Sequence, residues 1–325
     1  MQRRLKIFTW HIHGSYLYYL SQGNYDIYIP VDAARGEGYG GRGTFAFGSN
    51  VIEVPAGAVK SLELDCILFQ SHRNYLKDQY EVLSAQQQQL PRIYLEHDPP
   101  RSSPTDTAHP VDDPAVTLVH VTHFNKLMWD NNRTPATVIE HGVTMPDAAY
   151  TGELDKGLVV INNIVKRGRR LGLDVLQEVG RHVPLDLVGM NAAEAGGLGE
   201  VPLHELPAFA ARYRFFFNPI RYTSMGLAVC EAMMLGMPII GMATTEMPTV
   251  INNGYNGYID TDIEKLILKM KLLLQNREHA MELGRNAKET AMQRFNIRRF
   301  TGDWESLFRQ VTSSSSRHMA QDTNS

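Results

Sequence analysis

Short apolar runs alternate with longer segments of helical character along most of this chain. We expect strands at residues 5–10, 26–29, 66–69, 92–95, 117–121, 137–139, 157–161, 185–188, 214–218 and 237–241. We expect helices at residues 15–21, 72–84, 123–129, 173–181, 203–213, 227–235 and 263–274. Neighbouring parallel strands need a long crossover between them, which is usually a helix. This alternation therefore predicts a parallel α/β fold with helices on both faces of the sheets.

The length of the chain predicts two such domains. At 325 residues it exceeds what a single hydrophobic core usually serves. We expect Rossmann-like domains at residues 1–145 and 146–311, followed by a disordered polar tail at 312–325. Pro146, Gly152 and the lack of an apolar period mark residues 142–156 as the linker. Two such halves facing each other across a cleft would bind a ligand near the carboxyl ends of their strands.

Composition argues against several classes of function. The formal net charge of −3 gives no global basic field, so we expect no nucleic-acid partner. Cys66 and Cys230, the two cysteines, lie inside apolar runs, which favours a reducing, cytoplasmic location over a disulfide framework. No apolar stretch is long enough for a membrane-spanning helix, and the one after the basic start is too short for a signal peptide. Peripheral contact with a membrane surface stays open.

The most informative stretch of the sequence is residues 218–241. A strand ends at Asn218-Pro219, a polar turn follows, and a helix begins near Gly226 and stops at Gly236. A helix amino terminus offers unpaired N–H groups and a positive dipole, both suited to phosphate. Glu231 lies among apolar neighbours, where a carboxylate needs a partner, and a sugar diol supplies two hydroxyl donors. A structural helix whose glutamate caps nearby backbone is the alternative interpretation.

This stretch resembles the retaining, GT-B-fold glycosyltransferases of family 4, also called glycosyl transferases group 1. Their signature is a Glu, then Gly-Phe-Gly-Leu, a second Glu-Ala and Gly-x-Pro-Val. The matching places here are Met225-Gly226-Leu227, Glu231-Ala232, Gly236-Met237-Pro238-Ile239 and the turn at residues 253–258. The resemblance implies a GT-B-like fold, a final helix from about residue 294 that crosses back to the amino domain, and a nucleotide-sugar donor. It covers the carboxyl half and only scattered points of the amino half.

The same resemblance implies which residues bind the donor. Glu231 would hold the ribose, and the backbone amides of Gly226 and Leu227 would face the phosphates and the sugar. The complete donor-binding set that we predict is Gly14, Thr223, Ser224, Met225, Gly226, Leu227 and Glu231. Thr223 stands where the family has its first Glu, so a charged contact to the transferred sugar is missing. Thr244-Thr245-Glu246 replaces a small glycine pair, which predicts a narrower and more polar pocket.

A second matching segment is the basic loop at residues 166–170. It resembles the family's helix entry, where an Arg and a Lys neutralise the leaving diphosphate, a charge that grows as the glycosidic bond breaks. Asn163 occupies the family's Arg position and the loop is longer, so we assign the phosphate contact to Arg169 and Arg170. A solvated basic turn is the alternative.

In the amino half, His97 ends a predicted strand, where members of the family have a histidine that points at the donor sugar. A turn histidine bonded to Asp98 is the alternative. Gly14 follows the first strand and would let backbone approach a phosphate. The His-x-His pair before it lacks a third ligand, so we expect no metal. The glycine-rich segment 36–45 is not a phosphate-binding P-loop; a mobile loop and a plain connection both stay open.

These features predict a retaining hexosyltransferase without a cofactor. His97, Arg169 and Arg170 are the predicted catalytic residues. The donor is a UDP-, GDP- or ADP-linked sugar, and the acceptor is unidentified. A catalytically silent nucleotide-sugar-binding protein, motivated by Thr223 and Asn163, is one alternative. A GT-B phosphorylase or epimerase-like enzyme is the other, because the fold alone does not fix the reaction.

Overall fold

The computed structural model describes the backbone of residues 3–322 and the side chains of residues 3–313. The chain forms two compact units. Unit 1 comprises Met1–Gly142 together with Ile297–Ser325, and unit 2 comprises Val143–Asn296. The boundaries fall at Gly142 and Asn296, and residues 297–311 group with the amino-terminal unit. The sequence suggested domains at 1–145 and 146–311, with the final helix crossing back to the amino domain.

Unit 1 is built on a seven-stranded sheet with the order β3-β2-β1-β4-β5-β6-β7. Its strands are β1 (Lys6–Thr9), β2 (Asp26–Val31), β3 (Val51–Pro55), β4 (Cys66–Phe69), β5 (Arg92–Glu96), β6 (Val116–His120) and β7 (Ala136–Val138). Every pairing between them is parallel. The run Cys66–Phe69 is buried along its whole length, as expected for a parallel strand covered on both faces.

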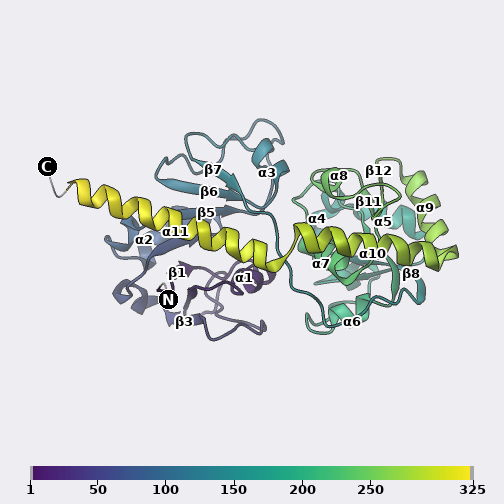
Figure 1. Ribbon diagram of the computed structural model, residues 1–325, viewed down its shortest axis with the longest axis horizontal. Coiled ribbons are helices and arrows are strands. Elements are labelled where there is room, and N and C mark those ends of the chain that lie inside the picture. The colour runs from purple at the N-terminus through teal and green to yellow at the C-terminus, as the bar shows by residue number, and fades with distance from the viewer. Residues whose placement is uncertain (1–2, 323–325) are drawn as a thin grey trace. The chain divides into compact units, whose positions relative to one another are not determined.

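The helical segments of unit 1 are short, apart from the last. They are α1 (Gly14–Leu20), η1 (Ala56–Ser61), the π-helical η2 (Asn74–Asp78), α2 (Gln79–Val82), η3 (Gln87–Gln89), α3 (His123–Met128) and α11 (Ile297–Asp322). In Figure 1 the yellow α11 runs along this unit, and its Trp304 Nε1 donates to the Tyr16 hydroxyl at 3.1 Å. The ring of Phe308 packs 5.0 Å from that of Tyr25. The last helix therefore completes the core of unit 1.

Unit 2 is built on a five-stranded sheet with the order β12-β11-β10-β8-β9. Its strands are β8 (Leu154–Val160), β9 (Leu185–Val188), β10 (Tyr213–Asn218), β11 (Ile239–Met242) and β12 (Gly257–Asp260). All of their pairings are parallel too. The central strand β10 is buried at all six positions.

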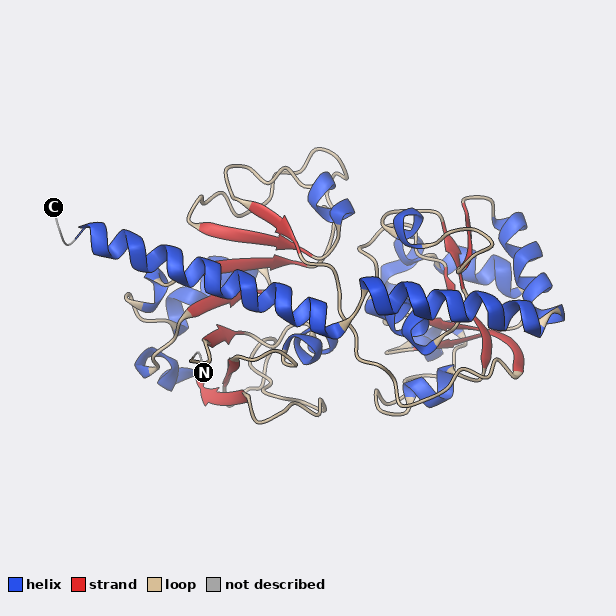
Figure 2. Ribbon diagram, in the orientation of Figure 1, coloured by secondary structure: helices blue, strands red, loops and turns tan. Residues whose placement is uncertain are grey.

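Helices lie on both faces of the unit 2 sheet (Figure 2). They are α4 (Ile164–Arg167), η4 (Gly168–Leu171), α5 (Leu173–Gly180), η5 (Ala192–Ala195), α6 (Leu206–Ala210), α7 (Leu227–Leu235), α8 (Met247–Val250), α9 (Ile263–Gln275) and α10 (Arg277–Arg294). Apolar residues of α5 and α9 pack on one face of the strands in a single core cluster. The predicted class, two parallel α/β domains, is confirmed.

The structure also contains elements that the sequence patterns did not predict. Strands β3 and β12 and helices α8 and α10 were missed. The predicted disordered tail at 312–325 begins inside α11, whose backbone stays helical to Asp322 because neither proline nor glycine interrupts residues 303–322. Residues 323–325 lie outside the described part. Within that part, no helix is long and apolar enough to cross a membrane.

Candidate functional site

Two loops meet at the carboxyl edge of the unit 2 sheet. The first follows β8 and contains α4 and η4, and the second, residues 219–226, connects β10 to α7. The Arg170 carbonyl accepts hydrogen bonds from the backbone N–H groups of Arg221 and Tyr222, at 3.1 and 3.2 Å. The basic loop and the loop before α7, which the sequence proposed separately as donor contacts, are thus joined through their backbones.

Gly172 makes this junction tight. It adopts a left-handed conformation with φ of +77°, and a Cβ placed on it would lie 2.0 Å from the Pro219 carbonyl oxygen. No side chain fits at that distance, so glycine is required both for its backbone angle and for the approach of the second loop.

An acidic residue holds the cations of the two loops. Asp174, in the first turn of α5, accepts from Arg169 at 2.5 Å and from Arg221 at 2.5 and 2.9 Å. The hydrogen bonds from Arg221, and to a smaller extent its positive charge, hold the pKa of the Asp174 carboxyl below its usual range. The Arg169 side chain is 77% exposed. The basic loop is therefore anchored, and Arg169 is already paired with a carboxylate.

Arg170 differs from its neighbour. It is half-buried, and no ion pair to its guanidinium is found within residues 3–313. Asn163, in the family's Arg position, has a left-handed backbone with φ of +54°, and its side-chain oxygen accepts from Asn191 at 2.6 Å. Of the cations predicted for the diphosphate, Arg170 is the one that the described contacts leave uncommitted.

Helix α7 begins directly after the second loop. Gly226, its N-cap residue, has an extended backbone and no side chain that could cap the first N–H groups. The first N–H groups of a helix are suited to bind a phosphate, and a glycine N-cap does not compete for them. Glu231 lies one turn further on and is half-buried. Met225 is only 3% exposed, so its side chain belongs to the core and its backbone alone can serve a ligand.

The loop after β11 carries the residues that replace the family's glycine pair. Thr245 has a φ of +52°, a conformation that is strained for a β-branched residue. Thr244 donates its hydroxyl to the Ile220 carbonyl at 3.0 Å. Glu246 is buried and pairs with Arg294 at 3.2 Å. The glutamate is thus part of an internal ion pair, and Thr244 ties this loop to the one before α7.

In unit 1, His97 directly follows β5 at the carboxyl edge of the sheet. Its ring centroid lies 3.9 Å from that of His13 and 4.9 Å from that of Tyr16. Its Nε2 atom is buried and has no hydrogen-bond partner among the described residues. Burial, with smaller contributions from His13 and His141, holds the pKa of His97 well below its usual range. The ring is therefore neutral near pH 7, with a nitrogen lone pair or N–H for a ligand.

Gly14 is partly exposed, but the space beside its Cα is occupied. It begins α1, and a Cβ placed on it would lie 2.2 Å from the ring of Phe45, which covers it. Phe45 belongs to the glycine-rich segment, which is held down through His11, whose Nδ1 lies 2.5 Å from the Gly41 carbonyl oxygen. These contacts hold residues 41 and 45 of the segment against the loop after β1 and do not decide between a mobile loop and a plain connection.

Sequence reasoning missed two members of these sites. Arg221 and Asp174 stand in no recognised motif, and only the meeting of the two loops pairs them. In the described chain, no group of three or more histidine, cysteine, aspartate or glutamate residues could hold a metal ion.

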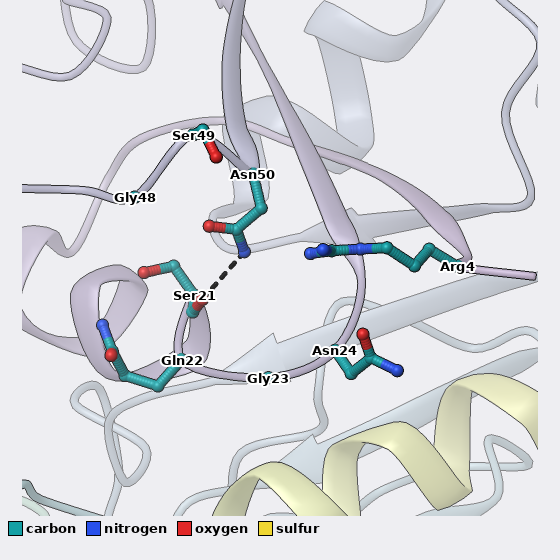
Figure 3. A pocket seen from close by; sticks show the side chains of 8 residues that line it. All are labelled: Arg4, Ser21, Gln22, Gly23, Asn24, Gly48, Ser49 and Asn50. Carbon is teal, nitrogen blue, oxygen red and sulfur yellow. Dashed lines mark hydrogen bonds between the residues drawn. The ribbon is translucent and has the colours of Figure 1, made fainter. Parts of the chain in front are cut away.

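A polar pocket of about 400 Å³ lies elsewhere in unit 1, near the amino ends of β1, β2 and β3 (Figure 3). It is lined by Arg4, Ser21, Gln22, Gly23, Asn24, Gly48, Ser49 and Asn50. Asn50 donates its amide to the Ser21 carbonyl at 2.8 Å, and Arg4 pairs with Asp26 at 3.0 Å. None of these residues was predicted to bind the donor.

Comparison with known proteins places the strongest similarity on unit 2. Residues 192–290 match the family described as Glycosyl transferases group 1. The trehalose synthases of Thermococcus litoralis and Pyrococcus furiosus are each 36% identical over 72 residues, or 22% of this chain. The matched segment spans only 18% of the length of these relatives.

Solved structures resemble the whole chain. A sucrose-phosphate synthase from Thermosynechococcus elongatus matches with a TM-score of 0.71 at 14% identity, covering 96% of this chain and all of the other. Anabaena HepE in complex with UDP matches with a TM-score of 0.62 at 12% identity, over 95% of this chain and all of HepE. A glycosyltransferase from Rickettsia africae matches with a TM-score of 0.65 at 12% identity, over 95% and 99% of the two chains. At these identities the likeness establishes the GT-B fold.

The fold and the matched segment together define a class. The two parallel-sheet units have the architecture of GT-B proteins, and the segment that contains α7 matches a glycosyltransferase family. The class that they support is a glycosyltransferase enzyme of GT-B fold.

Proposed function

We propose that this protein is a member of family 4 that transfers a hexosyl group from a nucleotide-sugar donor to an acceptor, with retention of configuration. The carrying observation is the carboxyl edge of the unit 2 sheet. There a helix amino terminus with a glycine N-cap, a half-buried glutamate on the same helix and an arginine without an ion pair among the described residues come from segments that are hydrogen-bonded together.

Each group has a role in this proposal. The first N–H groups of α7 and the guanidinium of Arg170 bind the diphosphate, whose negative charge grows as the glycosidic bond breaks. Glu231 accepts hydrogen bonds from the ribose hydroxyls. Thr223 and Ser224 offer hydroxyls, and Met225, Gly226 and Leu227 offer backbone, to the donor. His97 contacts the transferred sugar.

A UDP-linked donor is the first candidate. The Anabaena structure contains UDP, and a second structure of the same protein contains UDP and glucose. We therefore choose UDP-glucose as the first probe, with GDP- and ADP-glucose beside it.

Glu231→Gln tests the assignment. The amide keeps the shape of the side chain but removes the charge, and a charged hydrogen bond to a hydroxyl stabilises by roughly 1.5–3 kcal/mol, or about ten- to a hundredfold in affinity. Calorimetric titration with UDP should show a loss of that size. Glu264→Gln, at an exposed position on α9, is the matched control and should bind as the parent does. Unchanged affinity in a folded Glu231→Gln protein would remove Glu231 from the donor site.

A catalytically silent binding protein is the second candidate. Its support is that Asn163 replaces the family's Arg and is bonded to Asn191, while Thr223 replaces a charged residue. Binding of UDP-glucose without release of UDP over long incubation, with and without simple sugar acceptors, would favour this alternative. Measurable release of UDP would favour the enzyme.

A further inference from the structure

A buried carboxylate–imidazole pair lies behind His97. Glu96 ends β5 and is 8% exposed, and its Oε2 lies 3.1 Å from Nε2 of His109, which is 2% exposed. Neither residue appears in the predicted site. A buried carboxylate is costly unless its oxygens are hydrogen-bonded, so the pair needs an explanation.

The contacts of His109 define its protonation. The backbone N–H of Val111 donates to Nδ1 at 3.1 Å, so Nδ1 must hold a lone pair. The ring proton then lies on Nε2, which donates to Oε2 of Glu96. His109 is therefore a neutral, oriented donor to a carboxylate.

The other oxygen of Glu96 holds the backbone beyond His97. Oε1 accepts the N–H of Asp98 at 2.9 Å. The same peptide segment is held from α3 and its end, where Asn125 donates to the His97 carbonyl at 3.3 Å and Trp129 Nε1 to the Asp98 carbonyl at 2.8 Å. Both peptide groups that flank the Cα of Asp98 are thus fixed by side chains, and the first of them includes the carbonyl of His97.

We propose that Glu96 and His109 are positioning residues for His97, which hold its backbone so that the ring stays seated against His13 and Tyr16 with Nε2 available to the transferred sugar. This inference rests on the role of His97 in the proposed function. It deepens that function, because a side chain must be held within fractions of an ångström to act on a reacting group.

A purely structural pair is the competing explanation. It would stabilise unit 1 without affecting the ring of His97. The positioning role and the purely structural role predict different effects of Glu96→Gln on the ring of His97. The amide of Gln has one acceptor oxygen, whereas the Asp98 N–H and the His109 Nε2–H are two donors, so one donor loses its partner while the volume is kept.

His109 offers a matched pair of variants. The side-chain nitrogen of Gln can take the place of Nε2–H, so His109→Gln should keep the bond to Glu96, whereas His109→Leu removes it. We expect His109→Gln to rescue what His109→Leu loses.

The first readout needs no ligand. Amide hydrogen exchange and the ring signals of His97 are followed by NMR in the full chain. In Glu96→Gln and His109→Leu we expect the Asp98 amide to exchange about tenfold faster or more, since an opened hydrogen bond unprotects it, and the His97 ring signals to shift or broaden. Unchanged exchange and unchanged ring signals would overturn the inference.

The second readout is the release of UDP from UDP-glucose. We expect kcat to fall about tenfold in Glu96→Gln with KM nearly unchanged, because the loss concerns the reacting group rather than donor binding. In a His97→Ala background the same substitution should have no further effect. An equal loss in both backgrounds would make the pair structural. If His97→Ala itself leaves turnover unchanged, the role of His97 fails, while the exchange data still decide whether the pair positions it.

Discussion

The junction of the two donor loops gives a quantitative prediction at Gly172. Replacing it with Ala adds a Cβ that would lie 2.0 Å from the Pro219 carbonyl oxygen, in a backbone with φ of +77°. A left-handed conformation costs an L-residue about 1–2 kcal/mol. Overpacking against rigid neighbours adds about 1–3 kcal/mol, so we expect Gly172→Ala to lower the free energy of unfolding of unit 2 by about 2–5 kcal/mol.

Gly196 separates the two contributions. It has nearly the same backbone, with φ of +76°, but a Cβ there would meet nothing within 4 Å. Gly196→Ala should therefore lose only the conformational part, about 1–2 kcal/mol. The difference between the two variants measures the steric contact between the loops.

The assay is urea unfolding followed by far-ultraviolet circular dichroism, with tryptophan fluorescence beside it. The three tryptophans, Trp10, Trp129 and Trp304, all belong to unit 1, so their fluorescence reports the unit that carries neither substitution. Gly172→Ala should also weaken UDP binding, because it separates the loops, whereas Gly196→Ala should not. Equal losses of stability in both variants, with equal UDP affinity, would refute the argument that close approach requires Gly172.

Two further predictions concern charge and pH. Arg170→Ala should reduce UDP affinity more than Arg169→Ala, because Arg169 already pairs with Asp174. Titration calorimetry measures this with UDP, and with uridine as a control whose affinity should change in neither variant. A larger loss of UDP affinity for Arg169→Ala would reverse the assignment. Burial lowers the pKa of His120 to about 4 from its ordinary 6.5, so the folded chain resists protonation there. The contribution of His120 to the free energy of unfolding is fully present above pH 6.5 and falls by up to about 3 kcal/mol as the pH drops toward 4. His120→Gln should reduce this pH dependence in urea titrations at several pH values.

The alternation of apolar runs was enough to predict the fold class, because parallel strands covered on both faces leave an unmistakable pattern. The strand Cys66–Phe69 and the helix Leu227–Leu235 were predicted at their observed bounds. Helix α10 was missed for a physical reason. Apart from Leu283, its buried residues are alanines and a glycine, and Gly284 packs so closely that a Cβ there would lie 2.0 Å from the Gly236 carbonyl oxygen. These positions follow a helical period, but small residues at most of them give a weak hydrophobic signal.

In the candidate site too, features of a single element could be predicted from the sequence, whereas contacts between distant segments could not. The start of α7 after Gly226 and the histidine after β5 follow from the order of residues along one element, so the sequence could place them. The contacts of Arg169 could not be predicted, because they depend on Asp174 and on an arginine 52 positions away that reaches the Arg169 carbonyl at 2.9 Å. The extra length of the basic loop at residues 166–170 suggested that its side chains point into solvent. In the structure its backbone is hydrogen-bonded to the loop before α7, and one carboxylate, Asp174, binds an arginine from each of the two loops, so the added length is held in place. In the proposed site, Arg169 is already paired with Asp174, so we assign the diphosphate to Arg170 and to the amides of α7.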